Sequence, residues 1–301
     1  MTTVFVLSGG AALGAVQVGM LQVLEAAGVR ADMIVGTSVG AINAAWIAES
    51  TTGYRLDELA ALWLSLRRGQ VFSPGTAGVF ALLGRRSGML DQRALRHLLT
   101  RHVGVDRLED AAVPLHVIAT DVLTGRDVRL SSGSAVDAIL ASAAIPGVFA
   151  PVVIDGRAYM DGGVVNNSAI SHAVALGAST IYVVPTGWSC SLERLPVGPL
   201  GMALHGLTVL VQHRLADDVE HYRQTVDVRV VPPPCPIRVG PADFSHAREL
   251  IDAGRASATT WLRGGGEVDL RHLRPHDHRM SVSAPPPLEP PLVRRPPRSR
   301  R

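Results

Sequence analysis

Lysine is absent from this sequence of 301 residues, so all 29 basic side chains are arginines. The only cysteines are Cys190 and Cys235, which are too few for a disulfide scaffold and lack the spacing of metal ligands. Aromatic residues make up only 4% of the chain, and the core must therefore rest on alanine, valine, leucine and isoleucine. Such a core suits tightly packed layers of helices and strands, and the cysteine count makes a reducing compartment the default expectation.

Charged side chains are missing from the first 24 residues. This run does not predict a signal peptide or a membrane anchor, because no basic segment precedes it and polar residues and glycines between Ser8 and Gln22 interrupt it. We instead predict a buried strand over Thr3 to Leu7, a glycine turn, and a helix from about Ala12 to Ala27 that Gly28 ends.

The net charge of +3 owes much to the C-terminal end, where five arginines face a single acidic residue, Glu289. A basic end of this kind is most often a solvated extension, and we expect no nucleic-acid partner. From about Gly264 the pattern dissolves into glycine, proline and arginine, a composition typical of disorder. The remaining residues are enough for one large globular domain or two small ones.

The most informative segment is the pentapeptide from Gly36 to Gly40, which has the form G-x-S-x-G with Ser38 at its centre. A short apolar run precedes it, and Ala41 to Trp46 after it reads as a helix. This is the strand–turn–helix context of a nucleophile elbow, in which a sharp turn exposes the serine hydroxyl beside the N-terminus of a helix. The plainer alternative is a tight turn with an incidental serine.

The chain opens as strand, glycine loop, helix, strand, elbow and helix, which predicts a largely parallel sheet. An apolar segment over 71–86, ending in Arg85 and Arg86, is either a lid, a membrane-touching surface or a segment packed on the core. The further elements that the pattern predicts are helices over 56–66 and 90–102 (the second capped by Asp91), strands over 115–120 and 127–130, a helix over 135–143, a strand over 181–185, a helix over 192–222, a strand over 226–231 and a helix over 245–262.

Two familiar folds fit the elbow or the glycine loop poorly. In α/β-hydrolases with a Ser-Asp-His triad, several strands precede the nucleophile, whereas only one strand is expected here before the elbow strand. The later histidines, at 172, 205, 213 and 221, do not stand in a recognisable loop after a late strand. A dinucleotide-binding loop is also excluded, because Ala11 stands where its second glycine is required.

The best candidate for a base is Asp161, which Gly162 and Gly163 follow. Two glycines allow close approach of the backbone, so that the carboxylate can reach Ser38 directly. The alternative is a hairpin turn, but Asp155-Gly156 suits that role better, because apolar strand-like segments flank it on both sides.

With these motifs in order, the chain resembles the bacterial patatin-like phospholipases. The resemblance rests on Ser8-Gly9-Gly10, the elbow at 36–40, the stretch Ala141-Ser142-Ala143-Ala144-Ile145-Pro146-Gly147-Val148-Phe149, and Asp161-Gly162-Gly163, and it covers roughly residues 3 to 260. It implies a three-layer α/β/α fold with a mostly parallel central sheet and hydrolysis of lipid acyl esters by a Ser-Asp dyad.

Carried over by position, the resemblance assigns the nucleophile to Ser38 and the base to Asp161. It places the oxyanion hole at the backbone N–H groups of Gly9, Gly10 and Ala11. Supporting positions of the motifs are Gly14, Gly36, Gly40, Gly162 and Gly163. No metal or organic cofactor is implied, and the expected partner is a lipid or another hydrophobic ester.

The glycine loop departs from the family pattern G-G-G-x-R/K-G at two positions. Ala11 replaces the third glycine, which we expect to require a negative φ, and Leu13 replaces the basic residue. The loss of that cation puts preference for phospholipids in question more than ester hydrolysis. It also motivates the alternative hypothesis of a catalytically inactive homologue that binds lipid or a protein partner.

We accordingly expect an acyl hydrolase domain over residues 1–263 and a disordered, proline- and arginine-rich tail over 264–301. The expected location is cytoplasmic, with peripheral membrane contact through the 71–86 segment and the basic tail as a further hypothesis.

Overall fold

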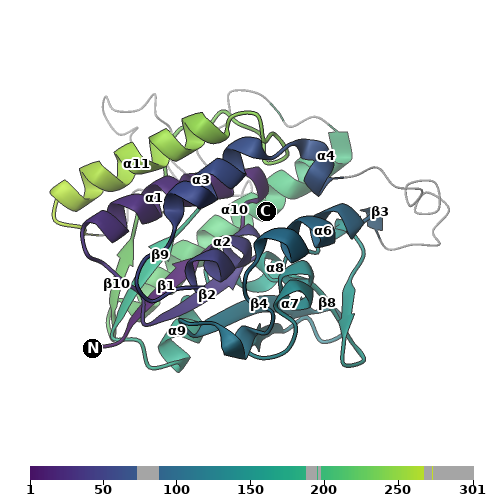
Figure 1. Cartoon of the computed structure of the whole chain (residues 1–301), viewed down its shortest axis with the longest axis horizontal. Coiled ribbons are helices and arrows are strands. Elements are labelled where there is room, and N and C mark those ends of the chain that lie inside the picture. Colours follow the sequence, from purple (N-terminus) through teal and green to yellow (C-terminus); the bar gives the residue numbers. More distant parts are fainter. Residues whose placement is uncertain (73–87, 188–194, 196–197, 268–272, 274–301) are drawn as a thin grey trace, which may run out of the picture.

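Eight strands form one central sheet in the computed structural model of the chain, which describes residues 1–72, 88–187, 195, 198–267 and 273 (Figure 1). The strand order is β10-β9-β1-β2-β4-β8-β7, and β5 pairs with β4 outside this path. Two further strands, β3 (Gly88–Leu90) and β6 (Gly147–Phe149), form a separate parallel pair. The strands of the central sheet are β1 (Thr3–Leu7), β2 (Met33–Thr37), β4 (Leu115–Asp121), β5 (Asp127–Leu130), β7 (Val152–Ile154), β8 (Arg157–Asp161), β9 (Thr180–Val184) and β10 (Asp227–Val230).

The sheet is mostly parallel, as the opening pattern of the sequence predicts. Strands β10, β9, β1, β2 and β4 run in the same direction, with β1 in register with β2 from Val4 opposite Met33 to Leu7 opposite Gly36. Strands β5 and β8 are antiparallel to β4, and β7 is antiparallel to β8. One strand alone precedes the elbow strand β2 in the chain, which agrees with the expectation that set this fold apart from α/β-hydrolases.

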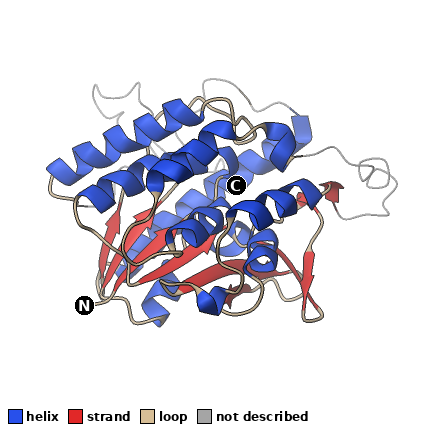
Figure 2. Ribbon diagram, in the orientation of Figure 1, coloured by secondary structure: helices blue, strands red, loops and turns tan. Residues whose placement is uncertain are grey.

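Helices cover both faces of the sheet, which makes three layers (Figure 2). Successive side chains of β1 alternate between the faces: Phe5 and Leu7 belong to the larger core, and Val4 and Val6 belong to the smaller one. The larger core packs under α1 (Ala15–Ala26), α2 (Val39–Ile47), α3 (Leu56–Ser65), α6 (Arg93–His102), α7 (Ala135–Ser142) and α11 (Ala247–Arg263). The smaller core packs under α9 (Ile170–Ala175) and α10 (Gly198–Tyr222). Short helices are η1 (Ala11–Gly14), α4 (Arg68–Val71), η2 (Leu108–Asp110) and α8 (Gly163–Asn166).

The predicted strands and helices are found within a few residues of their expected bounds, with two local differences. The helix expected over 192–222 begins at Gly198, and residues 192–194, 196 and 197 lie outside the described residues. The helix expected from Leu90 begins at Arg93, because Gly88–Leu90 pairs as β3 with β6. Asp91 still serves the helix start, since its carboxylate accepts a hydrogen bond from the N–H of Arg93 at 2.8 Å. Most of the 71–86 segment and nearly all of the 264–301 tail lie outside the described residues.

Two features bear on where the chain resides. In the part that the structure describes, no helix is both long enough and apolar enough to cross a membrane. Cys235 is disulfide-bonded, and disulfides persist mainly in oxidising compartments. The cytoplasmic location, which rests on the low cysteine count, therefore stays a prediction.

Candidate active site

Ser38 lies at the junction of β2 and α2 in a backbone conformation that side-chain-bearing residues rarely adopt, with φ +54° and ψ −126°. The glycines around it are required by close contact: a Cβ on Gly40 would lie 2.1 Å from the carbonyl oxygen of Leu7, and one on Gly36 would lie 2.5 Å from Cα of Ala41. Helix α2 therefore packs directly against β1 and β2. This strained strand-to-helix turn has the geometry of a nucleophile elbow.

Ser38 is hydrogen-bonded to Asp161 across 123 positions of sequence. The Ser38 hydroxyl donates to Oδ2 of Asp161 at 2.7 Å, and Oδ1 of the same carboxylate accepts the N–H of Gly163 at 2.7 Å. The sheet brings the pair together, because Ser38 follows β2, β2 pairs with β4, and Asp161 ends β8 opposite Ala119 of β4.

Asp161 is buried, and this burial raises the pKa of its carboxyl from 3.8 to about 6. The hydrogen bonds from Ser38 and Gly163 oppose the rise, since both stabilise the ionised form. At neutral pH the group is a carboxylate, and it is a stronger base than an exposed aspartate.

Ser142 is hydrogen-bonded both to Ser38 and to Gly162, the residue after Asp161. Its hydroxyl accepts the backbone N–H of Ser38 at 2.7 Å and donates to the carbonyl of Ile118 at 2.5 Å. Its own carbonyl accepts the N–H of Gly162 at 3.2 Å. In the sequence, Ser142 stands out only as part of the 141–149 stretch that carries the family resemblance. Its contacts arise because α7 packs next to the turn at Ser38, and the local sequence pattern does not predict this packing.

Gly9 lies directly against Ser38, since a Cβ on Gly9 would lie 2.9 Å from Cβ of Ser38. Its N–H, however, donates to Oδ1 of Asn167 at 3.0 Å, and its carbonyl accepts the hydroxyl of Thr186 at 2.7 Å. The N–H of Gly9 is therefore already in use. Sequence reasoning assigned no role to Asn167 or Thr186.

Ala11 adopts φ +51°, so the expectation of a negative φ at this position is wrong. A left-handed conformation costs an alanine roughly 1–2 kcal/mol, and the surrounding contacts hold it there. The next residue, Ala12, donates its N–H to the carbonyl of Pro241 at 2.9 Å, and Leu13 donates its N–H to Gly10 at 3.1 Å. The N–H groups of Gly10 and Ala11 have no hydrogen-bond acceptor among the described residues.

A buried polar network anchors the glycine loop to the helices. Gln17 of α1 donates to the carbonyls of Ser8 at 2.9 Å and Val184 at 2.7 Å. Asn43 of α2 donates to the carbonyl of Gly14 at 3.0 Å and to Gln17, and it accepts the indole N–H of Trp63 at 3.0 Å. Gln17 and Asn43 are amide residues within two otherwise apolar helical segments. Such isolated polar residues are a sign of a buried hydrogen-bond network, and the sequence analysis assigned them no such role.

Other predicted features lie away from the Ser38–Asp161 pair. Leu13, which replaces the family's basic residue, is partly buried and packs against the larger core. His172 pairs with Asp127 at 3.0 Å, and the hydroxyl of Ser38 is bonded to a carboxylate instead of an imidazole. Within the described residues, no cluster of three or more His, Cys, Asp or Glu side chains is placed to hold a metal ion.

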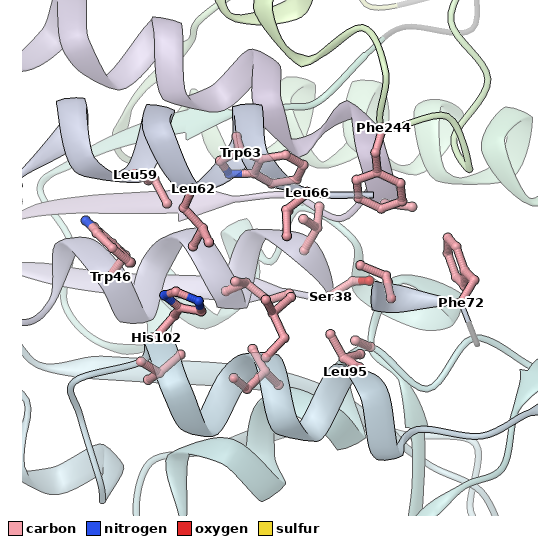
Figure 3. Close-up of a pocket in the computed structure, with 18 of the residues that line it drawn as sticks. Ser38, Trp46, Leu59, Leu62, Trp63, Leu66, Phe72, Leu95, His102 and Phe244 are labelled. Atoms are coloured by element: carbon pink, nitrogen blue, oxygen red, sulfur yellow. The ribbon is translucent and has the colours of Figure 1, made fainter. Parts of the chain in front are cut away.

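An apolar cavity opens beside Ser38 (Figure 3). In the close-up, Phe72 and Phe244 lie near one end, Trp46 and His102 lie at the other, and Ser38 lies between them. Helices α2, α3 and α6 supply half of the lining residues, and Ala11 of the glycine loop also contributes. The arrangement offers a hydroxyl with its base at the edge of a cavity that suits a hydrocarbon group.

A family model described as patatin-like phospholipase matches residues 5–174, a range that contains Ser38, Asp161 and the glycine loop. Patatin-like phospholipase domain-containing protein 6 of Mus musculus is 29% identical over 211 residues, which cover 69% of this chain and 15% of that protein. Lysophospholipase nte1 of Aspergillus terreus is 29% identical over 182 residues, covering 60% of this chain and 12% of the relative. An NTE family protein of Mycobacterium tuberculosis is 31% identical over 193 residues, covering 64% of this chain and 49% of the relative. The chain thus spans half or less of the length of these relatives.

Two solved structures show a more distant likeness. VipD from Legionella pneumophila has a TM-score of 0.41 at 13% identity, over 87% of this chain and 67% of its own. A chain of the complex of SpcU with ExoU from Pseudomonas aeruginosa has a TM-score of 0.42 at 16% identity, over 87% of this chain and 53% of its own. At TM-scores this low, neither structure adds to what the family model shows.

Proposed function

Because the chain belongs to the patatin-like phospholipase family, we propose that it is a serine acyl-ester hydrolase acting on lipid or other hydrophobic esters through Ser38 and Asp161. The observation that carries the proposal is the 2.7 Å hydrogen bond between the Ser38 hydroxyl and the buried Asp161 carboxylate. A hydroxyl in contact with a base of raised pKa, on a strained elbow beside an apolar cavity, is equipped for nucleophilic attack on an ester.

In the proposed reaction, Oγ of Ser38 attacks the ester carbonyl carbon while its proton passes to Oδ2 of Asp161. The tetrahedral intermediate then collapses, the bond to the leaving alkoxide breaks, and the alkoxide takes the proton from Asp161. Water next attacks the acyl-enzyme, giving its proton to Asp161, and the carboxylic acid leaves as Ser38 regains its proton. One carboxylate thus acts twice as base and twice as acid.

The oxyanion would be held by backbone N–H groups of the glycine loop. Of the three predicted donors, Gly9 has its N–H bonded to Asn167, so we assign the donor role to Gly10 and Ala11 and a positioning role to Gly9. Each donor is worth about 3 kcal/mol of transition-state stabilisation. The Thr186 and Asn167 contacts to Gly9 hold the loop in place before substrate binds.

The substrate class follows from the cavity and the family. The lining residues are almost all apolar, which suits the acyl part of a lipid or another hydrophobic ester. Leu13 is packed on the core, and it offers no positive charge to a phosphate head group. We therefore propose ester hydrolysis without assigning a head group, with residues 1–263 as the catalytic domain and peripheral membrane contact as its mode of reaching lipid.

The test is covalent labelling with a fluorophosphonate probe, followed by intact mass and peptide mapping. The wild type is expected to gain one adduct on Ser38, and Ser38→Ala is expected to gain none. Ser131→Ala is the matched control, because Oγ of Ser131 lies 2.8 Å from Nδ1 of His116 and so offers a serine–histidine pair elsewhere in the fold. An adduct on Ser131 would overturn the assignment of the nucleophile.

Hydrolysis is the second arm of the same test. Turnover of a short-chain ester should be lost in Ser38→Ala and Asp161→Asn, while far-ultraviolet circular dichroism stays that of the wild type. Binding to lipid vesicles with neither adduct nor turnover would favour the inactive binding homologue instead.

A further inference from the structure

The cavity beside Ser38 has a definite direction along helix α2. Ser38, which directly precedes the helix, and then Ile42 and Trp46 within it line the cavity at intervals of four positions. Residues four apart lie on one face of a helix, so the cavity follows that face from the nucleophile to Trp46. Leu62 of α3 and Leu95 of α6 line it from the two sides (Figure 3).

The walls are apolar even where the lining residues carry polar atoms. The indole N–H of Trp63 donates to Asn43, and the indole N–H of Trp46 donates to the carbonyl of Arg55 at 3.2 Å. Both rings therefore present only carbon to the cavity. His102, next to Trp46 in Figure 3, also lines the cavity.

Trp46 closes the far end and is held there from outside. Its side chain is 9% exposed, and the Arg55 guanidinium lies over its ring, 5.6 Å from the centroid. Arg55 is in turn paired with Glu49 at 3.3 Å and with Glu58. The hydrogen bond to the backbone of Arg55 and the stacked guanidinium fix the indole as an end wall.

The distance from Ser38 to this wall corresponds to a medium-length acyl chain. Eight residues of α-helix rise about 12 Å along the axis. An extended hydrocarbon chain advances about 1.3 Å per carbon, given C–C bonds of about 1.52 Å and angles of about 111°. The length from the nucleophile to Trp46 is thus about nine carbons.

We propose that this cavity holds the acyl chain of the substrate and that Trp46 sets its maximum length, so that the preferred substrates are esters of acyl chains with about eight to ten carbons. The inference rests on the proposed hydrolase function and adds to it the chain length and the residue that determines it. Longer chains meet the indole of Trp46 before the ester carbonyl reaches Ser38.

The test is a profile of kcat/KM against 4-methylumbelliferyl esters from butyrate to myristate. For the wild type, kcat/KM is expected to peak at eight to ten carbons and to fall at least tenfold by fourteen. Trp46→Ala should move the peak to longer chains by about three carbons, and Trp46→Phe should move it by a smaller step. Ile42→Trp, one helical turn nearer Ser38, should move it to about four or five carbons.

Trp261→Ala is the matched control, because Trp261 is also 9% exposed but lies on α11 outside the cavity. It should keep the wild-type profile. A small alkyl fluorophosphonate should label Ser38 at the same rate in the wild type and in Trp261→Ala.

The outcomes separate the two proposals. Labelling of Ser38 together with a chain-length profile that is flat, or unchanged in both Trp46 variants and in Ile42→Trp, would overturn the role of Trp46 and leave the hydrolase proposal standing. Absence of both labelling and hydrolysis of every ester would overturn both.

Discussion

The hydroxyl of Ser142 accepts the backbone N–H of Ser38 at 2.7 Å, although 104 positions separate the two serines in the sequence. This bond supports the strained φ of +54° at Ser38, because it gives the buried N–H of the turn a hydrogen-bond acceptor. Helix α7 therefore supports the turn at Ser38, even though none of its side chains is hydrogen-bonded to Asp161 in the described residues.

Ser142→Ala should lower kcat by about 10- to 100-fold with little change in KM, because the elbow loses the contact that orients Oγ. It should also lower the free energy of unfolding by about 1–3 kcal/mol, since a buried N–H is left without an acceptor. Steady-state kinetics and urea unfolding measure the two effects. Ser134→Ala is the control: its hydroxyl caps the same helix at 3.2 Å from the N–H of Asp137, so it should lose stability and keep kcat.

The rate of ester hydrolysis should depend on the ionisation of Asp161. Because burial raises its pKa to about 6, kcat/KM should rise about tenfold per pH unit below pH 6 and level off above it. A pH-stat assay from pH 4.5 to 8.5 measures the profile. Asp218→Asn is a suitable control, since burial raises the pKa of that carboxyl as well, and its profile should match the wild type. A plateau reached already at pH 4.5 would contradict the role of Asp161.

The same pKa makes the ionised Asp161 unfavourable for stability. The folded state holds the proton more tightly than the unfolded state, so the contribution of the neutral carboxyl is fully present below about pH 4 and is lost as the pH rises through about 6. The loss amounts to about 3 kcal/mol for a shift of about two units. Asp161→Asn should therefore exceed the wild type in free energy of unfolding at pH 8 and equal it at pH 4. Equal curves at both pH values in urea unfolding would rule this out.

Ala11→Gly should raise the free energy of unfolding by about 0.5–1 kcal/mol, because glycine tolerates the observed φ of +51° without strain. Thermal unfolding at one pH is enough to detect the change. Ala12→Gly, at the next position of the same loop where no positive φ occurs, should instead be destabilising.

Gly40→Ala should prevent stable folding, since the added Cβ would lie 2.1 Å from the carbonyl oxygen of Leu7 in the larger core. Expression in soluble form and circular dichroism report the result. Gly206→Ala in α10 is the matched control: no atom lies within 4 Å of its added Cβ, so it should be neutral or slightly stabilising. A folded Gly40→Ala variant would show that the contact between α2 and β1 can relax.

Local pattern was enough to predict most of the framework. The apolar run Thr3–Leu7, the elbow with Ser38 and the hairpin at Asp155 each combine a strand-forming segment with turn residues that are adjacent in the sequence. Their geometry depends on neighbouring residues, and their bounds in the structure follow the pattern closely. The proximity of Asp161 to Ser38 was anticipated as well, from the paired glycines and the family resemblance, and the 2.7 Å hydrogen bond matches it.

Other features depend on contacts between segments that are distant in the sequence, and local residue patterns do not predict such contacts. The bond of Asn167 to the N–H of Gly9, the bond of Ser142 to Ser38 and the cavity that ends at Trp46 each join segments that pack together only in the folded chain. The negative φ predicted for Ala11 is wrong for the same reason. Backbone preference disfavours the observed positive φ, but the hydrogen bond of the loop to Pro241 and its packing on the core outweigh that preference.

Residue type and spacing along the chain are sufficient to predict the strands, the elbow and the pairing of Ser38 with Asp161, because these features depend mainly on local pattern and on the order of the motifs. The loop N–H groups that are available, the hydrogen bonds that brace the elbow and the end of the apolar cavity depend instead on the folded chain. These properties arise from hydrogen bonds and close packing between distant segments, whose energies exceed the local preferences that a sequence displays.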